Sequence, residues 1–110
     1  MMAYDENLAE RVRVLLETEA GFSERKMFGG IAFMLDGKMC CGVVDGDLML
    51  RLGPDGADTA LERPHVRPMD FTGRPMSSMV FVAPEGLQGR SLRAWVGQAA
   101  AFARSLPPKG

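Results

Sequence analysis

The stretch that decides the fold of this chain is Lys26-Met27-Phe28-Gly29-Gly30-Ile31-Ala32-Phe33-Met34-Leu35-Asp36-Gly37-Lys38. It joins an apolar run at residues 31–35 to the pair Asp36-Gly37. Asp-Gly between two apolar runs is the strongest short-range signal of a β-hairpin, because both turn residues take a positive φ. The pair Gly29-Gly30 predicts a bulge or a bend just before the first strand. The stretch therefore predicts the start of an antiparallel sheet.

The same turn signal recurs at Asp45-Gly46, so the hairpin extends to a meander with strands at residues 31–35, 38–44 and 47–52. With two-residue loops, Phe33 faces Cys40, and side chains alternate between the two faces of the sheet. One predicted face carries no charge and should pack on helices, whereas the other is mixed. The charge-free face comprises Ala32, Met34, Met39, Cys41, Val43, Leu48, Leu50 and Leu52. The mixed face comprises Ile31, Phe33, Leu35, Lys38, Cys40, Val44, Asp47, Met49 and Arg51.

Helices are expected before, between and after the strands. The spacing of apolar residues predicts helices over residues 5–18, 54–62 and 91–105, with Asp5 and Ser91 as N-caps. Further strands are predicted at residues 78–83 and, as a short edge strand, at 66–69. The resulting order, α-β-β-β-α-(β)-β-α, predicts an α+β two-layer sandwich in which an antiparallel β-sheet has helices on one face. Residues 1–110 are expected to form a single domain.

Composition and charge exclude several classes of protein. The net charge is −1 over 110 residues, and no helix-turn-helix is recognisable, so direct nucleic-acid binding is not expected. No apolar run approaches the ~20 residues of a membrane span, and the N-terminus lacks a signal-peptide pattern. The adjacent Cys40 and Cys41 form no disulfide framework, which suits a reducing compartment. We therefore expect a cytoplasmic protein.

Several segments, in order, resemble the N-terminal domain family of the TfoX/Sxy proteins over nearly the whole chain. They are Lys26-Met27-Phe28-Gly29-Gly30 with Ala32-Phe33, Leu48-Met49-Leu50-Arg51-Leu52-Gly53-Pro54, Arg67-Pro68-Met69-Asp70-Phe71, Thr72-Gly73-Arg74-Pro75-Met76, Val80-Phe81-Val82-Ala83-Pro84-Glu85 and Leu92-Arg93-Ala94-Trp95-Val96. The resemblance implies the same α+β domain. It also implies a role in transcription regulation, because the family's namesakes regulate bacterial natural competence together with the cyclic-AMP receptor protein at promoters. Those namesakes carry a second, C-terminal domain that this sequence does not show, so a stand-alone N-terminal domain is expected. The family supplies no catalytic residues.

Chemistry-bearing residues are sparse. In the expected register Cys40 points outward beside Arg51, whose guanidinium would lower the pKa of the thiol. A catalytic cysteine usually needs a histidine base, and the only histidine is His65, in the proline-rich segment. These residues have no zinc-ligand spacing, and Gly29-Gly30 lacks the rest of a phosphate loop. We therefore expect no catalytic, cofactor-binding or metal-binding residues.

The predicted partner or ligand surface consists of Phe33, Cys40, Met49 and Arg51, which share the mixed face. Methionine lines adaptable binding surfaces, so a protein partner is expected, and a homodimer through this face is one form of it. The function expected is that of a non-enzymatic regulatory and protein-interaction domain, like the N-terminal domain of competence regulators. The alternative is a small enzyme or an anionic-ligand-binding domain that uses Cys40 and Arg51.

Overall fold

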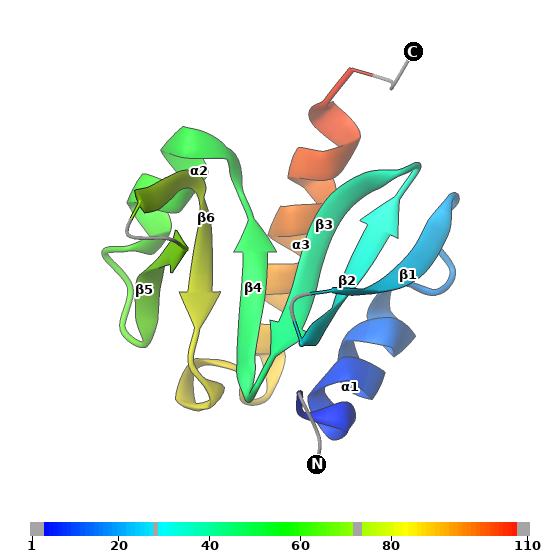
Figure 1. The fold of residues 1–110 in the computed structure, drawn as a ribbon, viewed down its shortest axis with the longest axis horizontal. Coiled ribbons are helices and arrows are strands. Elements are labelled where there is room, and N and C mark those ends of the chain that lie inside the picture. The colour runs from blue at the N-terminus through cyan, green and yellow to red at the C-terminus, as the bar shows by residue number, and fades with distance from the viewer. Residues whose placement is uncertain (1–3, 28, 72–73, 108–110) are drawn as a thin grey trace.

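The computed structural model describes residues 4–27, 29–71 and 74–107. A six-stranded sheet forms one layer, and the helices lie behind it (Figure 1). The elements are α1 (Glu6–Leu16), β1 (Phe22–Met27), β2 (Gly30–Leu35), β3 (Lys38–Val44), β4 (Asp47–Arg51), α2 (Gly53–Ala60), β5 (Val66–Phe71), β6 (Arg74–Val82), the short 3-10 helix η1 (Pro84–Gly86) and α3 (Arg90–Ser105). The predicted α+β class and element order are confirmed.

The strands pair antiparallel in the order β1-β2-β3-β4-β6-β5. Strand β1 is one strand more than the pattern predicted. Its sequence, Phe-Ser-Glu-Arg-Lys-Met, carries three consecutive charges, and it lies at the edge of the sheet, where charged side chains discourage pairing with another chain. An edge strand of this kind lacks the apolar alternation that marks a half-buried strand.

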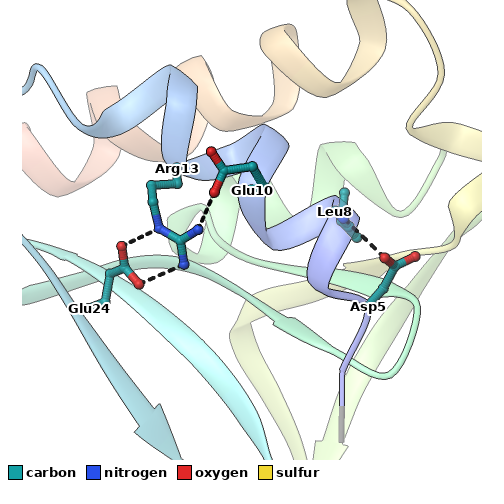
Figure 2. Close-up of polar contacts among 5 residues, drawn as sticks. All are labelled: Asp5, Leu8, Glu10, Arg13 and Glu24. Carbon is teal, nitrogen blue, oxygen red and sulfur yellow. Dashed lines mark hydrogen bonds and ion pairs between the residues drawn. The ribbon is translucent and has the colours of Figure 1, made fainter. Parts of the chain in front are cut away.

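Helix α1 begins where the sequence predicts. The Asp5 side chain accepts a hydrogen bond from the Leu8 N–H at 3.1 Å, as an N-cap does (Figure 2). Further along α1, Arg13 binds Glu10 on its own helix and reaches Glu24 on β1, with Nη2 2.8 Å from Oε1 (Figure 2). This hydrogen bond with Arg13 lowers the pKa of the Glu24 carboxyl. Arg13 therefore ties α1 to the edge of the sheet.

Helix α3 begins differently from the prediction. Its first residue is Arg90, and Gly89 stands at the N-cap with a φ of 59° and no capping side chain. Ser91 lies within the first turn, so its assignment as N-cap is wrong. A positive φ suits glycine, and it lets the chain turn directly from the loop after η1 into the helix.

A β-bulge in the β2–β3 hairpin changes the predicted register. Leu35 pairs with Lys38 and Met34 with Met39, but the register then shifts and Phe33 pairs with Cys41. The expectation that Phe33 faces Cys40 is therefore wrong. A bulge places two residues opposite one, so every residue of β2 beyond it changes partner. Turn chemistry alone does not reveal such an inserted residue.

The main core lies between the sheet and the helices. The bulge brings Ile31, Phe33 and Leu35 onto the same side as both cysteines, so their assignment to the mixed face is wrong. The charge-free face was predicted correctly for Cys41, Val43, Leu48 and Leu50, which lie in this core, but wrongly for Met39, which lies on the opposite face. Helices α1, α2 and α3 all contribute buried residues to this core. Its sheet side consists of Ile31, Phe33, Leu35, Cys40, Cys41, Val43, Leu48, Leu50, Val80 and Val82.

Candidate interaction surface

The opposite face of the sheet carries a second, smaller apolar cluster. It consists of Met39, Met49, Met79 and Phe81, and we call it the methionine face. In Figure 1 this face is turned toward the viewer, and no helix of the described residues covers it. Met49 and Met79 are buried, whereas Met39 and Phe81 are half-buried. The cluster is therefore open at its edges and filled at its centre.

The strand register explains how Met49 is buried without a helix above it. Met49 pairs with Gly42 on one side and with Phe81 on the other. A Cβ built on Gly42 would lie 2.7 Å from the Met49 ε-methyl, closer than packed carbon atoms approach. The missing side chain at Gly42 therefore leaves the space into which Met49 folds. The methionine face therefore extends without interruption across β3, β4 and β6.

Charged groups border the methionine face on the β5 side. Arg67 pairs with Phe81 in the sheet register, and its guanidinium carbon lies 4.7 Å from the centre of the Phe81 ring. The same guanidinium binds Asp47 at 2.6 Å. A cation over an aromatic ring is favourable, so Arg67 holds the Phe81 ring in place while half of its own side chain stays in solvent.

A cavity of about 500 Å³ lies at the other margin of the methionine face. Its lining includes Met34, Met39, Lys38 and Arg51. The Lys38 ammonium donates a hydrogen bond to the Leu106 carbonyl at 3.2 Å, and the Arg51 guanidinium carbon lies 5.9 Å from the centre of the Phe102 ring. Two cationic side chains thus border one apolar hollow.

The structure separates the four residues of the predicted surface. Phe33 and Cys40 have no exposed area and lie in the main core, so the expectation that they share a face with Met49 is wrong. Met49 lies at the centre of the methionine face, and Arg51 pairs with Met79 at its margin. The bulge causes this separation, because it turns Phe33 and Cys40 toward the helices.

The two cysteines are buried and free. The Cys41 side chain hydrogen-bonds Cys40, and this bond lowers the pKa of Cys40, against the opposing effect of burial. The same bond, together with burial, raises the pKa of Cys41. The expectation that Arg51 lowers the pKa of Cys40 is wrong, because Arg51 is not among the groups that shift this pKa. His65 lies in the loop before β5, where its backbone carbonyl accepts a hydrogen bond from Ala83.

The family model of the TfoX N-terminal domain matches residues 15–103 of this chain. The chain belongs to the TfoX N-terminal domain family. Comparisons with curated proteins and with solved structures found no match. The matched residues of this TfoX N-terminal domain include all six strands, and therefore the whole methionine face.

Within the described residues, no helix of this TfoX N-terminal domain has the length and apolarity needed to cross a membrane. The part of the chain that the structure describes also holds no group of three His, Cys, Asp or Glu residues arranged for a metal ion.

Sequence reasoning placed Met49 and Arg51 near this surface but missed Met79 and Phe81. Both lie on β6, which is distant in sequence yet hydrogen-bonded to β4. The strand itself was predicted at residues 78–83, but without a neighbouring strand. The missing information was its position beside β4, which only the sheet order supplies.

Proposed function

We propose that this TfoX N-terminal domain is a non-enzymatic regulatory domain that binds a protein partner and acts in transcription regulation, as competence regulators do. The observation that carries the proposal is the family match over residues 15–103. The burial of both thiols supports binding over thiol chemistry, because a nucleophilic cysteine must be reachable by its substrate.

The methionine face is the surface that we assign to this partner. An apolar centre with a polar margin is the usual composition of a protein interface, and methionine side chains adapt to a partner's shape. Asp47 is already bound by Arg67, whereas Arg51 forms none of the ion pairs among the described residues. The partner surface that fits is therefore apolar, with carboxylates positioned to meet Arg51.

Replacing Met39 by Glu tests the proposal. Met39 is half-buried at the edge of the face, so a carboxylate there places charge in the contact without opening the main core. We expect the variant to reproduce the transcript changes of a gene deletion, and to capture the partner at least about tenfold more weakly. Asp58→Asn, an exposed change on α2, is the matched control. Unchanged transcripts in the deletion strain would refute the regulatory role.

The cavity beside Lys38 and Arg51 favours a second candidate function, the binding of a small anionic ligand with an apolar body. Cys40 does not line this cavity, so the candidate involves Arg51 without the thiol. Titration with decanoate, followed by amide chemical shifts, should perturb residues around Arg51, whereas inorganic phosphate should not. Arg51→Gln should weaken decanoate binding about tenfold. Absence of any shift at millimolar decanoate would exclude this candidate.

A further inference from the structure

A second apolar hollow lies in the helix layer, between α1 and the start of α3. Its volume is about 520 Å³, and it is lined by Glu10, Arg11, Val14, Leu15, Gly89, Arg90, Leu92 and Arg93. We call it the α1–α3 groove. Val14 is 56% exposed, the most exposed of the large hydrophobic residues that the structure describes as exposed. The groove therefore presents apolar surface to solvent on the side of the molecule that the methionine face does not occupy.

The charges at the rim of the groove are mostly positive. Arg11, Arg90 and Arg93 border it, and the only acidic lining residue is Glu10. The Glu10 carboxylate is bound by Arg13, so it does not neutralise the rim. No ion pair among the described residues involves Arg90 or Arg93. A chain with a net charge of −1 thus concentrates cations around one apolar groove.

Two of these arginines lie at the end of α3 where positive charge destabilises the helix. Arg90 and Arg93 lie in the first turns of α3, which has no acidic residue in its first turn and no capping side chain. The N-terminus of a helix carries partial positive charge, so cations there are unfavourable and anions are favourable. An acidic group placed over this end would satisfy the helix terminus and both guanidinium groups together.

We propose that the α1–α3 groove docks an acidic amphipathic helix of a partner protein. The apolar side chains of such a helix cover Val14, Leu15 and Leu92, and its flanking carboxylates meet Arg11, Arg90 and Arg93. This is helix-in-groove recognition, in which spacing at i, i+3, i+4 and i+7 provides the apolar contacts. The inference goes beyond the proposed function, because the groove lies in the helix layer and its test does not depend on the methionine face.

A synthetic peptide of about 14 residues provides the probe, with Leu at i, i+3, i+4 and i+7 and Glu on both flanks. We expect it to bind the full chain with a Kd below about 100 µM at low salt, and to bind more weakly as salt increases. Amide chemical shifts should change along α1 and the first turns of α3. A matched peptide with Lys in place of every Glu should not bind.

Charge reversal of Arg90→Glu together with Arg93→Glu should weaken binding of the Glu peptide at least about tenfold. The same change should leave stability equal or higher, because carboxylates suit the N-terminus of α3; a fall in binding is therefore not a fall in folding. Val14→Ser should weaken binding about three- to tenfold. Arg25→Glu, an exposed change on β1, is the control that should not alter binding.

Three results would overturn the proposal. The first is failure of the Glu peptide to bind the wild-type chain, and the second is equal binding of the Lys peptide. The third is self-association of the chain that Val14→Ser abolishes, since the groove would then hold a second copy. Loss of the partner in Met39→Glu alone leaves peptide binding intact, so failure of the proposed function and failure of this inference are distinguishable.

Discussion

Phe33→Ala is expected to lower the free energy of unfolding by about 3–5 kcal/mol. Phe33 has no exposed area and is the largest of the fully buried side chains. Its removal leaves a cavity against Phe22, whose ring centre lies 6.1 Å away, and it removes the ring over which the Arg13 guanidinium carbon lies at 6.0 Å. Small domains are stable by only about 5–15 kcal/mol, so this one substitution removes a large part of the total. Urea unfolding followed by circular dichroism measures the change.

The matched control for this prediction is Phe81→Ala on the opposite face of the sheet. Phe81 is half-buried and packs on methionines rather than in the main core, so its truncation should cost about 1–2 kcal/mol, as partial burial implies. The difference between the two losses tests whether Phe33 lies in the main core and Phe81 on the opposite face of the sheet. Equal losses in the two variants, or a larger loss for Phe81→Ala, would contradict the placement of Phe33 in the core.

The sequence was sufficient for the parts of the fold that rest on local chemistry. The Asp5 cap and the Asp-Gly turns lie where they were predicted, because each depends on a few neighbouring residues. Asp36 and Gly37 both take a positive φ, at 53° and 77°, as the turn signal requires. In the second turn Asp45 takes a positive φ of 52° but Gly46 does not, so only the loop length was predicted correctly there. Local rules also gave α3, although not the residue at which it begins.

The predicted surface failed for a reason that local rules do not contain. Alternation assigns faces correctly only while the register is unbroken, and the bulge at Cys40 breaks it. No residue in Lys38-Met39-Cys40-Cys41 signals the insertion. The packing of Phe33 against the helices is a tertiary gain that competes with the regular ladder.

The methionine face and the α1–α3 groove are both consequences of tertiary structure. Met49 and Phe81 meet only because β6 lies beside β4. In the same way, Val14 and Arg90 border one groove only because α1 packs on α3. Periodicity identifies an apolar stripe on each helix, but Val14 lies outside the buried residues of α1 and is exposed.

In the native protein, Cys40 and Cys41 are expected to react with a neutral thiol reagent at least about 10³-fold more slowly than in the urea-unfolded chain. Neither side chain has exposed area, so labelling must wait for an opening of the structure. A domain stable by about 5 kcal/mol populates the unfolded state in fewer than one molecule in roughly 10³. Cys40→Ala and Cys41→Ala, each measured separately, assign the two rates.

Two effects on Cys40 oppose each other, and their sizes decide the outcome. The hydrogen bond from Cys41 lowers the pKa of Cys40, which favours the thiolate and hence reaction. Burial removes access altogether, and a thiolate that no reagent can reach does not react. Burial should therefore dominate, and labelling of Cys40 should accelerate in urea even though unfolding removes the bond that lowers its pKa.

Phe33→Ala links the two predictions. If labelling follows global unfolding, a loss of about 3–5 kcal/mol should speed it by about 10²- to 4 × 10³-fold, because each 1.4 kcal/mol is a factor of ten. If labelling instead follows a local opening of the β2–β3 hairpin, the rate should change far less, and Phe81→Ala should change it equally little.

Native Cys40 that labels as fast as a small-molecule thiol would overturn the burial argument and restore the alternative in which Cys40 is reactive. Slow labelling that accelerates with Phe33→Ala would mean that the thiols serve the core, and that binding in this domain belongs to its exposed faces.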